Sequence, residues 1–157
     1  HLLITHLPIF GSIIGALVLG YGLWTKSNQT KNAAHFIFII SAIGAGIAYL
    51  TGEGAEHAVK HIPGVTKNLI EIHEDAAIYA LISLIVLGGM SIIALVISRL
   101  KNSFTKSAST IILLFSLLSF GLVARTGYLG GQIRHTEIST DAIQNHHGGD
   151  ARDKDDD

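Results

Sequence analysis

Residues 78–97 read IYALISLIVLGGMSIIALVI, a run of twenty residues without a charged side chain. About 20 helical residues of this kind cross the hydrocarbon core of a bilayer, which is about 30 Å thick. A surface helix of a soluble bundle would instead carry polar residues along its outer side at every third or fourth position. This run lacks that pattern, which indicates a helix surrounded by lipid.

Three similar runs flank this one along the chain, and the predicted spans are residues 3–24, 33–50, 76–97 and 108–129. The composition agrees, because 48% of the residues are hydrophobic and only 15% are charged, which is unusual for a soluble domain. The first run lacks a basic leader and a small-residue cleavage site, so we expect a mature helix and not a signal peptide. The sequence predicts an all-α integral membrane four-helix up-down bundle over residues 1–137, followed by a flexible acidic tail over 138–157.

The charges of the connecting segments predict an orientation. Short loops rich in Lys and Arg stay on the cytoplasmic side of a membrane. The loops after the first and third spans are basic, whereas segment 51–75 and the tail carry the acidic residues. The basic residues concerned are Lys26, Lys31, Arg99, Lys101 and Lys106. We therefore expect both termini to be extracytoplasmic and the protein to lie in a bacterial cytoplasmic (inner) membrane.

Histidines gather at one end of the predicted bundle. Five of them stand near helix ends that an up-down arrangement brings together: His6, His57, His61, His73 and His135. Imidazole suits haem iron and transition metals, and bundle cores commonly hold such sites. The chain has no cysteine, which excludes c-type haem attachment and iron–sulfur clusters held by its own thiolates. We therefore expect one or two haem b groups, or another metal.

Two other residue types bear on a haem site. Glycines close to His135 and at the end of the second span would leave room for a porphyrin, although glycines such as Gly11, Gly15 and Gly20 more simply indicate close helix packing. Arg125 is the only basic residue within a predicted span, and such a charge is costly enough to suggest a function. We consider Arg125 a candidate partner of a haem propionate.

Two alternatives remain open for Arg125. Its partner could be Glu53 or Glu56, or its side chain could extend to the outer headgroups.

The helical rise separates the histidines by depth. Counted from the cytoplasmic helix ends at about 1.5 Å per residue, His73 and His135 lie at similar levels and His6 lies deeper. His57 and His61 occur in the most polar loop, where interfacial polar residues are common. They are therefore second-choice ligands.

Four short motifs in order resemble those of a known family. They are the segment from Thr5 to Ile9 with His6 and Pro8, the Thr51–Glu56 end of the second span, the His73-Glu74 start of the third, and the Thr126–Gly131 run ahead of His135. Over about residues 2–137 the chain resembles the bacterial membrane family catalogued as domain of unknown function 2231. The resemblance implies a four-helix membrane bundle in a redox setting, because some members are joined to cytochrome modules. Its histidine pattern falls on His6, His73 and His135.

The leading hypothesis is a membrane electron-transfer subunit that binds haem b and passes electrons between quinol and an extracytoplasmic cytochrome. Its first-choice ligands are His6, His73 and His135.

One alternative is a non-haem zinc, copper or iron site, in which carboxylates join the histidines. The carboxylates are those of Glu53, Glu56 and Glu74. Another alternative is a scaffold or assembly subunit of a larger respiratory complex. Catalysis by the chain alone is not indicated, because it has no nucleophile–base pair, P-loop or dinucleotide motif. The net charge of −1 argues against nucleic-acid binding.

Overall fold

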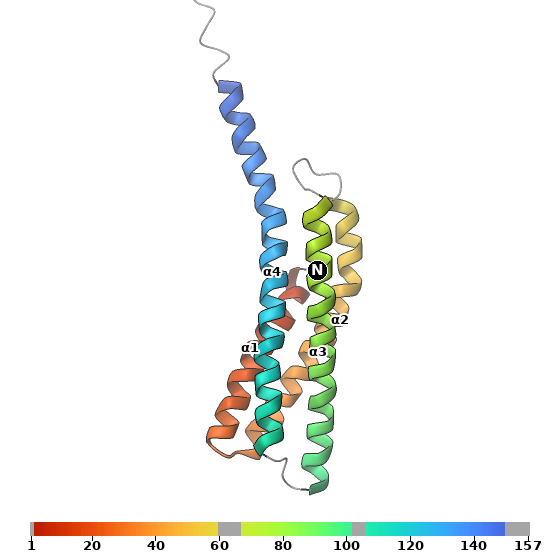
Figure 1. The fold of residues 1–157 in the computed structure, drawn as a ribbon, viewed down its shortest axis with the longest axis vertical. Coiled ribbons are helices and arrows are strands. Elements are labelled where there is room, and N and C mark those ends of the chain that lie inside the picture. The colour runs from red at the N-terminus through yellow and green to blue at the C-terminus, as the bar shows by residue number, and fades with distance from the viewer. Residues whose placement is uncertain (1, 60–66, 102–105, 150–157) are drawn as a thin grey trace, which may run out of the picture.

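The computed structural model describes the backbone of residues 2–59, 67–101 and 106–149, and the side chains of residues 5–52, 68, 70–100 and 106–131. Within the described backbone the chain forms four α-helices and no strand. They are α1 (Leu2–Trp24), α2 (Asn28–Val59), α3 (Lys67–Lys101) and α4 (Lys106–Gly149), which lie alongside one another in Figure 1. The all-helical prediction is confirmed for these ranges.

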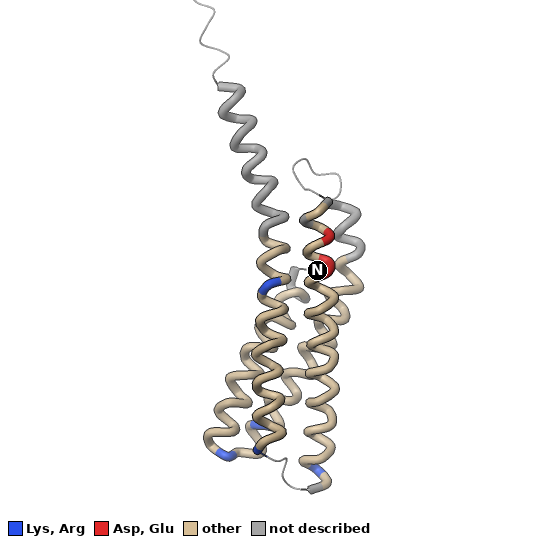
Figure 2. Tube along the Cα trace, viewed as in Figure 1, with Lys and Arg blue, Asp and Glu red and all other residues tan. Residues whose placement is uncertain are grey.

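Each helix runs antiparallel to the one before it. The helices contact each other in the ring α1–α2, α2–α3, α3–α4 and α4–α1, which is the arrangement of an up-down bundle. The start of α1, the end of α2 and the start of α3 therefore lie towards one end of the bundle (Figure 1). We call it the acidic end, because the described acidic residues Glu71, Glu74 and Asp75 lie there, and we call the other the basic end (Figure 2).

The turn between α1 and α2 explains why the first two helices form a close hairpin. Lys26 has a φ of 56°, the left-handed conformation that ends many helices. The amide of Ser27 then donates to the carbonyl of Gly22 at 3.0 Å, as in a Schellman motif. The Ser27 hydroxyl in turn accepts from the amide of Thr30 at 3.3 Å, which caps the start of α2.

All four helices are long and apolar enough to cross a membrane. The candidate spans are Thr5–Trp24, Asn28–Gly52, Ile70–Leu100 and Lys106–Gly131. Each contains or nearly contains the span predicted from sequence, so the prediction of four transmembrane helices is confirmed by their length and composition. The helices exceed the predicted spans because their polar flanks also adopt helical structure.

Large apolar side chains cover the outside of the bundle, and the inside combines small and polar residues with a few large apolar ones such as Phe38 and Leu87. Leu17, Ile93 and Leu114 are among the exposed hydrophobic residues, whereas Ala16, Ala80 and several serines are buried. Lipid removes the penalty for exposing apolar side chains, and small residues let membrane helices approach closely. This distribution is that of a bundle surrounded by lipid.

Two glycines of α1 allow that close approach. A Cβ at Gly11 would overlap the Ser41 side chain, and a Cβ at Gly15 would overlap the ring of Phe38. The predicted packing role of these two glycines is confirmed. It is wrong for Gly20, since no neighbouring atom lies within 4 Å of the position of its Cβ.

Helix α4 continues beyond the other three helices at the acidic end (Figure 1). It ends at Gly149, so the helix includes the first residues of the predicted tail. The flexibility of residues 138–157 stays a prediction.

Candidate functional site

His73 lies on the inner face of α3. Residues of α3 at intervals of three or four form a buried stripe, and His73 lies one turn before its first member. The stripe consists of Ala76, Ala80, Leu84, Leu87 and Ser91. Because residues at these spacings share one face of a helix, the imidazole extends towards α4.

A glycine on α4 makes room for this imidazole. A Cβ at Gly130 would lie 3.1 Å from Cε1 and 3.6 Å from Nδ1 of His73. The first distance is shorter than ordinary van der Waals contact, so a side chain at residue 130 would push against the ring. The Thr126–Gly131 run therefore has a physical role. Gly130 and the carbonyl of Thr126 form what we call the seat of His73.

The same seat sets the tautomer of His73. Nδ1 lies 3.1 Å from the carbonyl oxygen of Thr126, and a carbonyl oxygen accepts but cannot donate. Nδ1 must therefore carry a proton, and the lone pair of the neutral ring lies on Nε2. Metal-binding histidines commonly donate their second N–H to a backbone carbonyl, which fixes the ring and increases its basicity as a ligand.

The hydroxyl of Thr126 does not compete for the imidazole. It donates to the carbonyl of Leu122 at 3.0 Å, so the side chain of Thr126 is bonded to its own helix. His73 therefore meets α4 at a backbone carbonyl and at a glycine.

His6 lies on the outside of the bundle. Its side chain is exposed, and its ring stacks on Phe10 with 6.0 Å between the centroids and 18° between the planes. The buried residues of α1, such as Ser12, Ala16 and Leu19, lie on the opposite face. The structure therefore does not bring His6 and His73 together as a pair inside the bundle.

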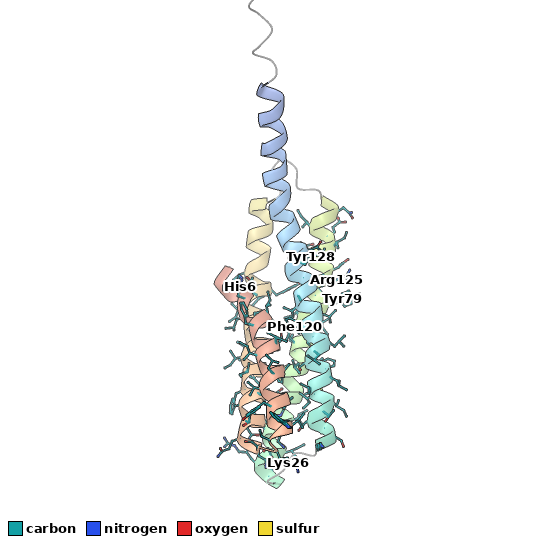
Figure 3. The ribbon with its side chains drawn as sticks, turned by 90° about the vertical axis from the view of Figure 1, so that its left-hand side faces the viewer. His6, Lys26, Tyr79, Phe120, Arg125 and Tyr128 are labelled. Carbon is teal, nitrogen blue, oxygen red and sulfur yellow. The ribbon has the colours of Figure 1, made fainter. Side chains whose placement is uncertain are left out.

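Arg125 is also exposed. Figure 3 places it at about the height of His6 but on the other side of the bundle, near the labels of Tyr79 and Tyr128. Arg125 precedes Thr126, which faces inward, and successive residues of a helix point in different directions. An outward position agrees with a side chain that extends to the headgroups.

The remaining predicted ligands are only partly described. Glu74 is exposed beside His73. His61 lies outside the described residues, and Glu53, Glu56, His57 and His135 lie on described helices but have no described side chains. Among the side chains that the structure does describe, no group of three His, Asp or Glu residues is close enough to hold a metal ion.

Neighbouring side chains occupy the space beside two of the glycines that were predicted to leave room for a porphyrin. A Cβ at Gly44 would overlap Leu7, and one at Gly127 would lie 3.5 Å from Cδ1 of Ile9. Gly46 and Gly131 have no neighbouring atom within 4 Å of their Cβ positions. Gly131 follows Gly130, which contacts His73, and the open space beside Gly131 lies at the exposed surface of α4.

Sequence analysis missed the polar interior nearer the basic end. His35 is only 1% exposed, and its Nδ1 lies 3.4 Å from the hydroxyl oxygen of Ser91 on α3. Serines on all four helices are buried as well. The available signal was the spacing of Ser109, Ser116 and Ser119, which places three hydroxyls on one face of α4.

Comparisons with models of protein families, with curated proteins and with solved structures found no match. Membership of the family named above therefore stays a prediction.

Proposed function

We propose that the chain is a multi-pass membrane subunit that binds haem b at its acidic end, with His73 as an axial ligand of the iron. The observation that carries this proposal is the seat of His73. Its Nδ1–H donates to a backbone carbonyl, and its Nε2 remains the ligating nitrogen.

The residues around His73 hold its ring in a fixed orientation, as a haem ligand requires. The carbonyl of Thr126 holds the ring, and Gly130 allows it to lie against α4. Haem b, when bound, supplies a one-electron redox couple. These two contacts would hold the imidazole of His73 in one orientation towards the bound group.

We assign His135 as the second ligand. It follows Gly130 by five residues on α4, which corresponds to about 7.5 Å along the helix. His6 is less suitable, because its ring is stacked on the outside of α1.

The charges of the two ends support an orientation for the proposed subunit. Lys26, Lys31, Arg99 and Lys106 lie at the basic end (Figure 2), and the positive-inside rule places such residues in the cytoplasm. The acidic end, both termini and the haem then face the periplasm or the outside of a bacterial cytoplasmic membrane. Quinol in the membrane would be the electron donor, and an extracytoplasmic cytochrome would be the acceptor.

A pyridine haemochrome spectrum of the purified protein tests the proposal. We expect near-stoichiometric haem b in the unmodified protein and its loss in His73→Ala. His6→Ala is the matched control, because it removes an exposed imidazole of the same end and should keep the haem.

Two results would contradict this assignment. One is stoichiometric zinc, copper or non-haem iron by elemental analysis without a Soret band, which would support the mixed histidine–carboxylate site. The other is full haem loading of the folded His73→Ala variant.

A further inference from the structure

Arg125 on α4 and Asp75 on α3 are exposed charges of opposite sign. The contacts of His73 show that they lie at nearly the same level. His73 meets α4 at Thr126 and Gly130, so it is level with about residue 128. Because the two helices are antiparallel, three residues towards the basic end lead to residue 76 on α3 and to Arg125 on α4. Asp75 therefore lies within about 2 Å of the level of Arg125, at a rise of about 1.5 Å per residue.

Both charges lie on the side of the bundle where α3 and α4 border each other. Nearer the basic end, a groove between these helices is lined by Met90, Ile93, Ala108, Ile111 and Ile112. Arg125 follows Ile111 by fourteen residues, which is about four helical turns, so it lies on nearly the same face of α4. Tyr79 precedes Met90 by eleven residues, which is about three turns, and Asp75 lies about one turn before Tyr79. Asp75, Tyr79 and Arg125 thus continue the two edges of the groove towards the acidic end.

These three side chains are directed away from the interior of the bundle. Arg125 is two residues after the buried Val123, which turns it about 200° from the inner face of α4. Tyr79 is 65% exposed, and Figure 3 places it on the same side of the bundle as Arg125. Among the described side chains, neither Arg125 nor Asp75 forms an ion pair. Both charges are therefore available to a partner from outside the bundle.

The depth of the two charges matches the headgroup region of a phospholipid. Counted from the midpoints of the candidate spans Lys106–Gly131 and Ile70–Leu100, Arg125 lies about 10 Å and Asp75 about 15 Å from the bilayer centre. The spans differ in length, so these figures give the depth only, and the contacts of His73 give the relative level. The hydrocarbon core ends about 15 Å from its centre. A long arginine side chain can extend from its Cα to the phosphates.

Tyr79 adds a hydrogen-bond donor beside the two charges. It lies three residues from residue 76, and thus about 4.5 Å nearer the basic end than the level of Arg125. Side chains of a helix lean towards its N-terminus, and α3 begins at the acidic end, so Tyr79 leans back towards that level. Tyrosine is common at membrane interfaces, where its ring stays in lipid and its hydroxyl meets polar headgroups. The hydroxyl can donate to a phosphate oxygen.

We propose that Asp75, Tyr79 and Arg125 form a headgroup site for one aminophospholipid, such as phosphatidylethanolamine. The phosphodiester accepts hydrogen bonds from the Arg125 guanidinium and the Tyr79 hydroxyl, and the primary ammonium donates to the Asp75 carboxylate. A guanidinium matches the geometry of phosphate oxygens. A headgroup with both charges complements the two side chains, whereas Asp75 repels a headgroup that has only a negative charge. The proposal does not depend on haem binding.

Native mass spectrometry of the full chain, released from micelles with one added phospholipid, measures how tightly each lipid is held. Arg125→Gln removes the partner of the phosphate. Arg99→Gln is the matched control, because it removes an exposed arginine at the basic end. We expect Arg125→Gln to lower the affinity for phosphatidylethanolamine at least about tenfold, since a charge-assisted hydrogen bond is lost. Arg99→Gln should retain the affinity.

Two results of this comparison would overturn the proposal. One is an equal affinity for phosphatidylethanolamine in the unmodified protein and in Arg125→Gln. The other is a lipid-free dimer that Arg125→Gln disrupts, since a second copy of the chain would then occupy this face.

The choice of headgroup is tested at the partner of the ammonium. Asp75→Asn should lower the affinity for phosphatidylethanolamine but not that for phosphatidylglycerol, which has no ammonium. Each lipid is compared between variants, because the lysines and arginines of the basic end attract acidic headgroups as well. Glu74→Gln is the control, since Glu74 is exposed but is turned about 100° from Asp75. Equal losses for both lipids in Asp75→Asn would contradict an aminophospholipid.

Solid-state NMR of the unmodified protein in phosphatidylethanolamine bilayers tests the two contacts directly. Dipolar coupling to the lipid phosphorus should attenuate the signal of the guanidinium carbon of Arg125. Coupling to a nitrogen-15 label in the headgroup should attenuate the signal of the carboxylate carbon of Asp75. The Arg125 signal is assigned by its loss in Arg125→Gln. If either carbon of the folded protein is not attenuated, the proposed headgroup site is wrong.

Discussion

His73 at the acidic end and His35 in the basic half of the bundle have different hydrogen-bond partners. His73 faces a backbone carbonyl, which only accepts, whereas His35 faces the hydroxyl of Ser91, which donates and accepts. The carbonyl fixes the proton on Nδ1 of His73. The hydroxyl permits either tautomer of His35. The two imidazoles therefore differ in how firmly their hydrogen-bond partners set the tautomer.

The two imidazoles also differ in how closely other helices enclose them. The ring of His73 lies against a glycine, six residues after the start of α3. His35 is enclosed between helices, with the ring of Phe38 at a centroid distance of 6.4 Å. An imidazole near the acidic end of the bundle can contact a ligand from outside, whereas an enclosed imidazole contacts only water or its neighbours.

The largest expected effect is that of filling the seat of His73. Gly130→Leu places a side chain where the imidazole lies, so the ring must leave the Thr126 carbonyl. Loss of a residue that orients a metal ligand typically costs 10–100-fold in affinity, and we expect a fall of at least about tenfold in haem affinity.

Gly131→Leu is the control for Gly130→Leu, since its Cβ position is open. Haem titrations of the two variants in detergent give the comparison. Equal affinities would mean that the seat of His73 does not matter for binding.

An intermediate effect should come from the neighbour of His35. In Gly15→Ala the new methyl group would overlap Phe38, which packs beside His35. Overpacking typically costs about 1–3 kcal/mol, so we expect this variant to be less stable. Gly20→Ala has room for its methyl group and gains up to about 1 kcal/mol from helix propensity.

Reversible unfolding in mixed micelles measures both changes. The expected result is a change of opposite sign in the free energy of unfolding of the two variants. Stabilisation by Gly15→Ala would contradict the described contact between α1 and α2.

The smallest effect should come from Ser91→Ala. It removes the hydroxyl partner of His35, and hydrogen bonds between membrane helices contribute about 0.6 kcal/mol on average. Ser83→Ala is the control, because that hydroxyl donates only to the carbonyl of Ala80 within α3. The same unfolding assay should show a greater loss of stability for Ser91→Ala, and the reverse order would speak against the His35–Ser91 contact.

The fold was largely predictable from the sequence, because hydrophobic length alone defines a transmembrane helix. The run 78–97 lies entirely within α3, and the four-helix order followed from the same criterion. The gathering of His6 and His73 towards one end followed from alternation of the helices. The glycine run before His135 was predicted to leave room for a porphyrin, whereas Gly130 makes room for the ring of His73.

The inward or outward direction of each histidine was not predictable. A lipid-facing helix is apolar on both its sides, so hydrophobicity does not distinguish the inner face of α1 from the face that carries His6. Whether His73 meets Gly130 depends on how far α3 is shifted along α4, which only the packed bundle defines. The buried serines went unnoticed because a hydroxyl changes hydropathy little.

Nitrogen-15 NMR of the histidine side chains, recorded before and after haem is added, tests the central claim most directly. The account predicts that His73 of the haem-free protein is a single tautomer protonated on Nδ1, and that its Nε2 signal is the one shifted strongly by the iron. His35 should remain unaffected by haem. A proton on Nε2 of His73 in the neutral ring, or an Nε2 signal that haem leaves unchanged, would contradict the account.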